Sequence, residues 1–238
     1  MIDYLLDPNN WTGSGGIPVL VGQHLIYTAV ALVIAAAIGV PAGLYVGHTG
    51  RGVVVIAGFA NALRALPTLG LIVLLVMIVA PLIASDLAFV IPSIIVLVLL
   101  AIPPIMTNTY AGIRAVDAAA VDAAVGMGYR PLRVLFSVQV PCALPLIISG
   151  FRGATLQVIS TATIAAYVSL GGLGRLIIDG RAQNDYDKML VGALLVAILA
   201  LVVDLLLALA ARVFVSPGLD RRTSRIPLRV RRSAVAAS

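Results

Sequence analysis

Side chains that could carry out catalysis or bind a metal are sparse in this sequence. The chain has one cysteine, Cys142, and two histidines, His24 and His48, and none of them belongs to a spacing typical of a metal or catalytic site. A glycine-rich phosphate loop of the kind that binds ATP is also missing. The sequence therefore predicts no catalytic residue, no metal site and no cofactor of its own.

Hydrogen-bonding side chains are concentrated in one apolar segment. Nine residues hold Thr155, Gln157, Ser160, Thr161 and Thr163. Such hydroxyls often bond to carbonyl groups of their own helix, which would be a structural role. Ser160, Thr163 and Tyr167 nevertheless share one helical face at spacings of three and four. We therefore keep two interpretations, a structural one and a polar path for a small solute lined by Thr155, Ser160, Thr163 and Tyr167.

A second unusual stretch, VDAAAVDAAVGMGYRPLRVLFSVQVP (residues 116–141), predicts two short helices joined by a sharp bend. Asp117 can cap a helix of alanines, Gly128 suits the left-handed position that ends it, and Pro131 suits the first turn of the next helix. An ordinary connector is the alternative, although connectors between helices are usually about 2 to 8 residues long. Contacts with a partner would come from Met127, Tyr129, Arg130, Leu132, Arg133 and Phe136.

The composition identifies the surroundings in which these elements lie. Hydrophobic residues make up 61% of the 238 residues, charged residues 11%, and the mean hydropathy is +1.10. This excludes an ordinary soluble domain and predicts an all-α polytopic membrane protein. We expect five spans, at about 20–46, around 67–84 with a start before Pro67, at 87–106, 140–166 and 189–215.

The distribution of charge predicts how these spans are oriented. The net charge is +6, but seven of the sixteen basic residues are arginines between Arg212 and Arg232, so membrane orientation explains the charge better than nucleic-acid binding does. If the amino terminus lies outside the cell, most of the arginines lie on the cytoplasmic side of the membrane. We expect an extracytoplasmic segment at 1–19, a transmembrane domain at 20–215 and a basic cytoplasmic tail at 216–238, which would lie near anionic lipid headgroups.

Charges and glycines inside the spans suggest packing roles. Asp204 is an intramembrane charge, and its pairing with Arg64 or Arg152 is a hypothesis. Arg152 could instead contact solute or lie near an inner water-filled vestibule, and Arg64 could lie close to headgroups. Small residues recur every four positions in the first span, and this stripe favours close packing within the chain over dimerisation. The stripe consists of Gly39, Gly43 and Gly47.

The sequence SLGGLG (residues 169–174) is expected to break the fourth span. Gly171, Gly172 and Gly174 would form either a flexible outer gate or a simple turn. Both His24 and His48 are expected to be ordinary histidines near the membrane interface.

The bend stretch resembles the coupling loop of binding-protein-dependent ABC importer permeases. That family has Glu-Ala-Ala, three residues, Gly, nine residues, Ile, any residue and Leu-Pro. Every spacing is kept here, with Asp in place of Glu and Val in place of both Ile and Leu. The matching residues are Asp122, Ala123, Ala124, Gly128, Val138, Val140 and Pro141.

Two longer stretches, TNTYAGIRAVDAAAVDAAVGMG and GFRGATLQVISTATIAAYVSLGGLGRLI, are similar to permeases that import glycine betaine, choline, carnitine or proline-like solutes. Methionine-type permeases share the five-span plan and remain an alternative. An ion-coupled secondary transporter is less favoured because neither repeats nor a midplane ion site are evident.

The resemblance implies a type I ABC importer in a bacterial-type cell membrane. Its partners would be a cytoplasmic ATPase that binds ATP, an extracytoplasmic solute-binding protein and a second permease of the same or a related chain. The loop, at 110–139, would dock on the ATPase. The docking residues implied by the resemblance and by the bend are Asp117, Asp122, Ala123, Ala124, Met127, Gly128, Arg130 and Pro141.

Overall fold

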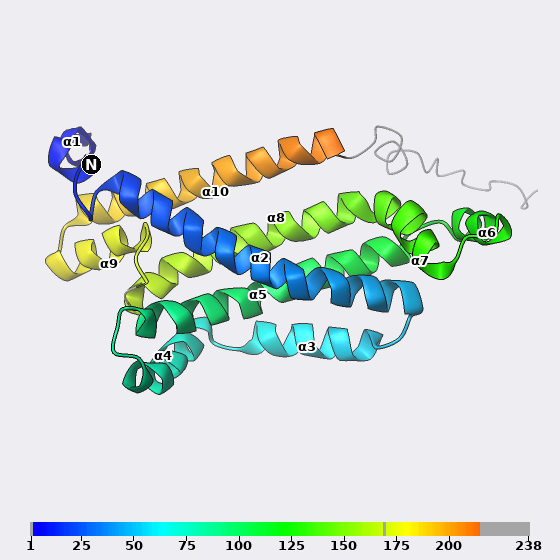
Figure 1. Cartoon of the computed structure of the whole chain (residues 1–238). Helices are drawn as coiled ribbons and strands as arrows, with labels where there is room; N and C mark the ends of the chain where they lie inside the picture. Colours follow the sequence, from blue (N-terminus) through cyan, green and yellow to red (C-terminus); the bar gives the residue numbers. More distant parts are fainter. Residues whose placement is uncertain (1, 169, 215–238) are drawn as a thin grey trace, which may run out of the picture.

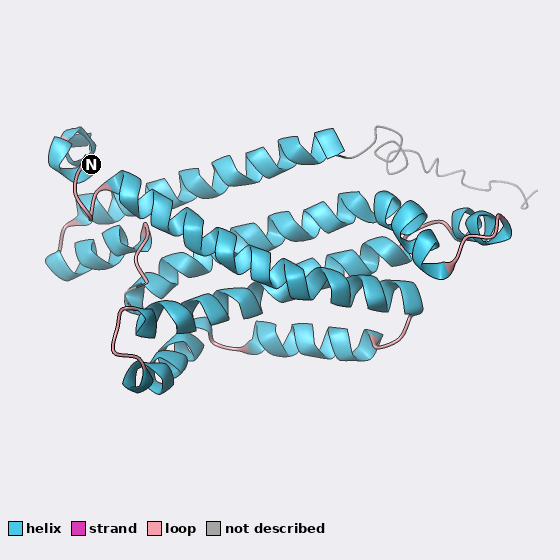
Figure 2. Ribbon diagram, viewed as in Figure 1, coloured by secondary structure: helices cyan, strands magenta, loops and turns pink. Residues whose placement is uncertain are grey.

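A computed structural model describes residues 2–168 and 170–214, except for the side chains of residues 64 and 214. Within these ranges the ordered elements are helices and no strand occurs, which confirms the predicted all-α class (Figure 2). Four long helices, α2 (Ile17–Thr49), α5 (Leu87–Arg114), α8 (Val140–Ala165) and α10 (Tyr186–Phe214), run along the molecule (Figure 1). The predicted tail at 216–238 and residue 169 lie outside the described residues.

Shorter helices occupy the two ends of the bundle. At one end lie α1 (Ile2–Leu6), a 3-10 turn (Pro8–Trp11) and α9 (Gly174–Gln183); at the other lie α6 (Ala118–Gly126) and α7 (Pro131–Val134) (Figure 1). We refer to these as the α9 end and the α6 end. Beside α5 lie α3 (Val53–Ala65) and α4 (Thr68–Val79), followed by a 3-10 turn (Ala80–Leu82).

Among the described residues, four helical stretches are long and apolar enough to cross a bilayer, and a bent pair would add a fifth. The pair is α3 with α4, whose axes meet at 85°. The second span, expected around 67–84 with a start before Pro67, thus consists of two helices with a sharp break between them. Leu66, which precedes Pro67, has an extended backbone with φ −73° and ψ 132°, and a proline disfavours the helical conformation in the residue before it.

Helix α5 is the centre of the bundle, packed against α2 on one side and α8 on another. The glycine stripe of α2 faces α5. A Cβ atom at Gly43 would lie 2.7 Å from the carbonyl oxygen of Met106, and one at Gly47 would lie 2.7 Å from the Ile113 Cβ. The predicted packing of this stripe within the chain is thus confirmed.

Helices α5 and α8 also pack closely at glycines. A Cβ atom at Gly150 of α8 would lie 2.8 Å from the carbonyl oxygen of Pro104 and 2.7 Å from the Asn108 Cβ. Gly112 of α5 faces Ala143 in the same way, with 3.1 Å to the Ala143 Cβ. Glycines on both helices therefore let the two backbones approach closely.

One ion pair attaches α10 to α8. The Arg152 guanidinium donates from Nε to the Asp204 Oδ1 at 2.8 Å and from Nη2 to Oδ2 at 2.7 Å. The expected pairing of Asp204 with an intramembrane arginine is confirmed, and Arg152 is the partner. Only 11% of the most apolar 18-residue stretch of α10 is buried inside the molecule. The bidentate pair therefore fixes the position of α10 against α8 more specifically than apolar packing does.

His24 has a packing role that its sequence did not indicate, while its expected place near the membrane interface stays a prediction. It is buried, with 1% of its surface exposed, where α2 packs against α8. Its Nε2 lies 3.1 Å from the carbonyl oxygen of Ile159, and the backbone of Gly172 covers its other side. Sequence reasoning missed this because the contact joins residues 135 positions apart.

We predict that Gly43→Ala destabilises the protein by about 1–3 kcal/mol, because its new methyl group would overlap the α5 backbone. Gly22→Ala on the same helix is the matched control, since its Cβ would meet nothing within 4 Å. Thermal unfolding in detergent measures the difference. Equal melting temperatures for the two variants would contradict the close α2–α5 contact.

We also predict that Arg152→Asp and Asp204→Arg each lower the yield of folded protein several-fold, because each leaves two like charges facing one another. The double exchange should restore most of the yield by re-forming the pair with reversed polarity. Membrane expression followed by size-exclusion chromatography measures this. A double variant no better than either single variant would show that the pair does not hold α10 in place.

Candidate functional site

The predicted helix, bend and second helix are present at the α6 end. The Asp117 carboxylate accepts a hydrogen bond from the Ala119 amide at 3.0 Å and caps α6. Gly128 ends the helix with φ +83°, and its amide returns to the Val125 carbonyl at 2.8 Å. Pro131 then opens α7. Each local residue type therefore has the structural role that its chemistry predicts.

The loop segment divides differently from the predicted range of 110–139. Residues 110–114 belong to α5, and α7 continues through a π-helical segment (Leu135–Gln139) directly into α8. The helical run from Pro131 to Val168 is thus 38 residues long. Consequently α6 and its flanking turns stand out from the bundle, and the second short helix is a continuous extension of a span.

Most of the predicted docking residues are exposed, including Asp122, Ala123, Met127, Gly128 and Arg130. Ala124 is the exception, at 1% exposure. Pro141 lies apart from them, exposed in the first turn of α8. Large apolar side chains of the same segment are also exposed, and we call them the apolar surface of the loop: Val125, Met127, Leu132 and Phe136.

A basic side chain borders this apolar surface. The Arg133 guanidinium lies 4.3 Å from the centre of the Tyr129 ring, which is cation–π geometry. An exposed apolar patch bordered by polar and charged groups is typical of a surface that binds another protein. The loop therefore has the chemistry of a docking surface.

The π-helical segment is connected to a second span by a contact that the sequence did not reveal. The Gln139 Oε1 lies 2.6 Å from the Nδ1 of His48, in the last turn of α2. Since an amide oxygen can only accept, Nδ1 carries the proton in this arrangement. Gln139 is buried, with 8% of its surface exposed. His48 is therefore not an isolated residue but joins α2 to the start of α8.

The four candidate path residues do not form one group. Thr155 is buried, with 2% exposure, whereas Ser160 and Tyr167 are exposed. The hydroxyls of Thr155, Ser160 and Thr163 each donate to the carbonyl oxygen four residues earlier, at 2.8, 2.9 and 3.1 Å. The structural interpretation therefore holds for all three hydroxyl donors, while a path along the face of Ser160, Thr163 and Tyr167 stays a prediction.

The glycines after α8 interrupt the helix as predicted. A short 3-10 turn (Ala166–Val168) follows α8, Gly171 and Gly172 have φ of +91° and +74°, and Gly174 begins α9. The Gly172 amide donates to the Gln23 Oε1 at 3.0 Å. A Cβ atom at Gly174 would collide with the Thr163 carbonyl oxygen. The break is thus held against α2 and α8, and its role as a gate stays a prediction.

Comparison with known families identifies the class of protein. Residues 39–215 match the family described as binding-protein-dependent transport system inner membrane component. This match covers well over half of the chain, and the chain belongs to that family. It is a multi-pass inner-membrane permease, and the resemblance found in the coupling-loop pattern is confirmed.

Curated relatives extend the similarity over nearly the whole chain. The choline transport system permease protein OpuBB of Bacillus subtilis (strain 168) is 30% identical over 210 residues, covering 88% of this chain and 94% of the relative. OpuBD of the same organism, also a choline transport system permease protein, is 34% identical over 85% of this chain and 86% of its own length. The osmoprotectant import permease protein OsmW of Salmonella typhimurium is 32% identical, covering 87% of this chain and 93% of the relative.

The fold is that of a solved importer. A chain of the MetNI methionine ABC transporter, in an inward-facing conformation, matches with a TM-score of 0.74 and 19% identity, covering 88% of this chain and 99% of that chain. The predicted type I ABC importer fold is therefore confirmed.

We predict that His48→Ala increases amide hydrogen exchange across residues 135–139 roughly fivefold, as expected for the loss of a hydrogen bond contributing about 1 kcal/mol. Thr49→Ala is the control, because its exposed hydroxyl bonds only locally, donating to the Tyr45 carbonyl and accepting from the Arg51 amide. Exchange measured by mass spectrometry on the detergent-solubilised protein distinguishes the two. Unchanged protection of the π-helical segment in His48→Ala would contradict the connection.

Proposed function

We propose that this chain is the membrane-spanning permease of an ATP-driven importer for osmoprotectants such as glycine betaine, choline, carnitine or proline-like solutes. The observation that carries the proposal is the similarity to permeases named for choline and osmoprotectant transport at about 30% identity across most of the chain. The exposed coupling loop supports the part of the proposal that concerns mechanism.

The partners follow from this assignment. A cytoplasmic ATPase would bind ATP and dock on the apolar surface of the loop, whose Met127 and Leu132 are 68% and 67% exposed. An extracytoplasmic binding protein would deliver solute at the α9 end, and a second permease subunit would complete the path. The amino terminus would then lie outside, and the α6 end in the cytoplasm, which agrees with the distribution of arginines.

The structure supports a mechanical route from the loop into the membrane. Closure of the ATPase dimer would displace α6 and α7 together, and α7 is continuous with α8 through the π-helical segment. The hydrogen bond between His48 and Gln139 would carry the same displacement to α2. Both spans would switch between inward-open and outward-open arrangements, as alternating access requires.

Solute would pass along the exposed face of α8. Ser160, Thr163 and Tyr167 offer hydroxyl oxygens whose lone pairs remain able to accept hydrogen bonds. The glycine break at 171–174 would act as the outer gate, because it joins α8 to α9 with two residues in the left-handed region. Thr155 would support the helix from inside rather than contact solute.

A methionine importer is the second candidate, favoured by the structural match to the MetNI transporter. At 19% identity that match concerns the fold, whereas the relatives named for osmoprotectant solutes are closer in sequence. ATP hydrolysis in nanodiscs, stimulated by a loaded binding protein, separates the candidates. Glycine betaine with its binding protein should stimulate the assembled complex, and stimulation by methionine with its binding protein alone would assign the second function.

The docking function of the loop can be tested at the bend. We predict that Gly128→Val disrupts assembly with the ATPase, because a β-branched residue at φ +83° is strained by at least about 1–2 kcal/mol and would re-aim the loop. Gly126→Ala is the control, since its Cβ meets nothing within 4 Å and its φ is not in the left-handed region.

Co-purification of the two subunits and solute-stimulated ATP hydrolysis are the measurements. The expected result is at least a tenfold loss of complex with Gly128→Val at normal permease yield, a difference of about 1.4 kcal/mol in association. Normal assembly and stimulation by Gly128→Val would mean that the loop is only a connector.

A further inference from the structure

A cavity of about 480 Å³ opens at the α9 end. This end lies at the opposite end of the bundle from the coupling loop (Figure 1). Its walls come from the amino-terminal segment, α2, the glycine break, α9 and the start of α10. The volume lies within the range of small-molecule sites, which is about 300–1,000 Å³. Side chains that matter most for its chemistry are Tyr4, Gln23, Arg175, Asp179 and Lys188.

The amino-terminal wall of the cavity is fixed by its own hydrogen bonds. The Asn10 side chain donates to the Tyr4 carbonyl at 2.8 Å, and the Trp11 indole donates to the Leu5 carbonyl at 2.8 Å. Asp7 caps the short 3-10 turn through the Asn9 amide at 2.9 Å. A buried apolar cluster of Ile17, Leu20, Leu173 and Leu176 then packs against Tyr4 and Leu5. Hydrogen bonds and apolar packing within the chain therefore hold this wall of the cavity in place.

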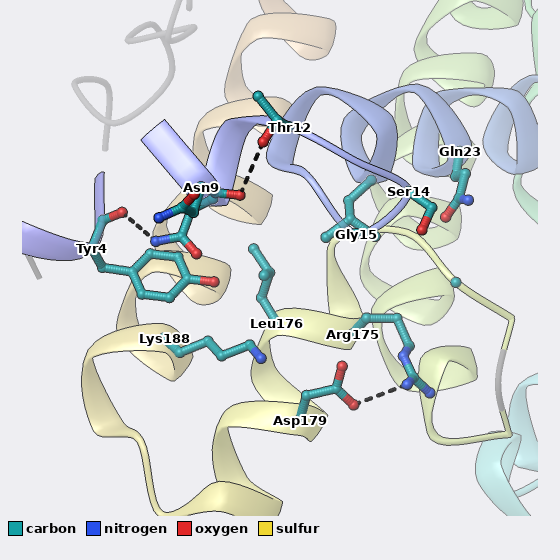
Figure 3. Close-up of a pocket in the computed structure, with 13 residues that line it drawn as sticks. Tyr4, Asn9, Thr12, Ser14, Gly15, Gln23, Arg175, Leu176, Asp179 and Lys188 are labelled. Carbon is teal, nitrogen blue, oxygen red and sulfur yellow. Dashed lines mark hydrogen bonds and ion pairs between the residues drawn. The ribbon is translucent and has the colours of Figure 1, made fainter. Parts of the chain in front are cut away.

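Groups of both charges border the cavity. The Arg175 Nη2 pairs with the Asp179 Oδ1 at 3.1 Å on one side. The Lys188 ammonium points toward the middle from the other side (Figure 3). Its side-chain contact with the Gln183 Oε1, at 3.4 Å, is longer than the 2.7–3.2 Å of a good hydrogen bond. Lys188 is thus a cation with capacity for an anionic ligand.

The Tyr4 ring lies beside Lys188 and also points into the cavity (Figure 3). Burial raises the pKa of the Tyr4 phenol above its ordinary value, and the carboxylates of Asp185, Asp179 and Asp7 raise it further. An aromatic face attracts a cationic group through its own charge distribution, and nearby carboxylates add to that attraction.

We infer that this cavity binds a small zwitterion, whose carboxylate lies at Lys188 and whose ammonium or quaternary ammonium group lies between the Tyr4 ring and Asp179. Arg175 already pairs with Asp179, so Lys188 is the lining cation outside that pair that can receive a ligand carboxylate. The aromatic face of Tyr4 favours a cationic group on the same ligand. The inference deepens the proposed function and rests on it for the placement of this end outside the cell.

The floor of the cavity connects the site to the proposed outer gate. Gln23 and Gly171 line the cavity, and the Gln23 Oε1 accepts the hydrogen bond from the Gly172 amide. A zwitterion bound here contacts the segment that joins α8 to α9. The site is therefore a receiving position at the outer end of the path.

Binding is tested with the full-length chain in lipid nanodiscs, without ATPase or binding protein. Equilibrium dialysis with radiolabelled glycine betaine should show saturable binding. Unlabelled glycine betaine should displace it, and acetate or tetramethylammonium should compete at least about tenfold more weakly, because each satisfies one half of the site. Proline and methionine are tested as further competitors, to show which class of zwitterion the cavity prefers.

Variants assign the binding to this cavity. Lys188→Met and Tyr4→Leu should each weaken binding about tenfold, while Lys188→Arg and Tyr4→Phe should keep it within about threefold. Arg181→Met is the matched control, because Arg181 is an exposed cation on α9 that does not line the cavity. Size-exclusion profiles identical to the wild type show that each variant is folded.

The outcomes separate this inference from the proposed function. Absence of saturable binding, equal competition by acetate, or equal loss in Arg181→Met and Lys188→Met would overturn the zwitterion site, while ATPase stimulation by glycine betaine would still support the importer. Displacement by methionine at concentrations far below those of glycine betaine or proline would support the site and overturn the osmoprotectant assignment.

Discussion

Close backbone contact between α2 and α5 is the constraint on which the rest of the bundle depends. In a bilayer, helices gain little from hydrophobic burial against one another, so packing at short range must hold them together. Gly43 and Gly47 place α2 directly against the α5 backbone, and Gly150 does the same for α8. With both neighbours fixed on α5, the two ends of the bundle acquire defined positions.

The two ends then differ in their chemistry. At the α6 end, a continuous helical run from Pro131 carries an exposed apolar surface outward on a rigid base, which suits force transmission from another protein. At the α9 end, a broken helix and a folded amino-terminal segment enclose a polar cavity. The span α8 runs between the two ends, so in the proposed mechanism displacement of the loop and occupancy of the cavity would act on the same helix.

Much of this organisation could be predicted from local residue types. The cap at Asp117, the left-handed Gly128 and the start at Pro131 follow from short-range chemistry, which operates within a few residues. The sharp break before Pro67 could not be predicted, because the apolar run continues through it. The pairing of Asp204 was anticipated because an intramembrane charge needs a partner, although only the packing of α10 against α8 selected Arg152.

By itself, the sequence determined the membrane class, the number of apolar segments, the coupling-loop pattern and the family. These properties depend on composition and on spacings between near neighbours, and they survive any rearrangement of the helices. Only the tertiary structure decided that His48 meets Gln139, that His24 is buried under Gly172, and that Tyr4 and Lys188 border one cavity. Those contacts join positions far apart in the chain, where no local pattern records which helix faces will meet.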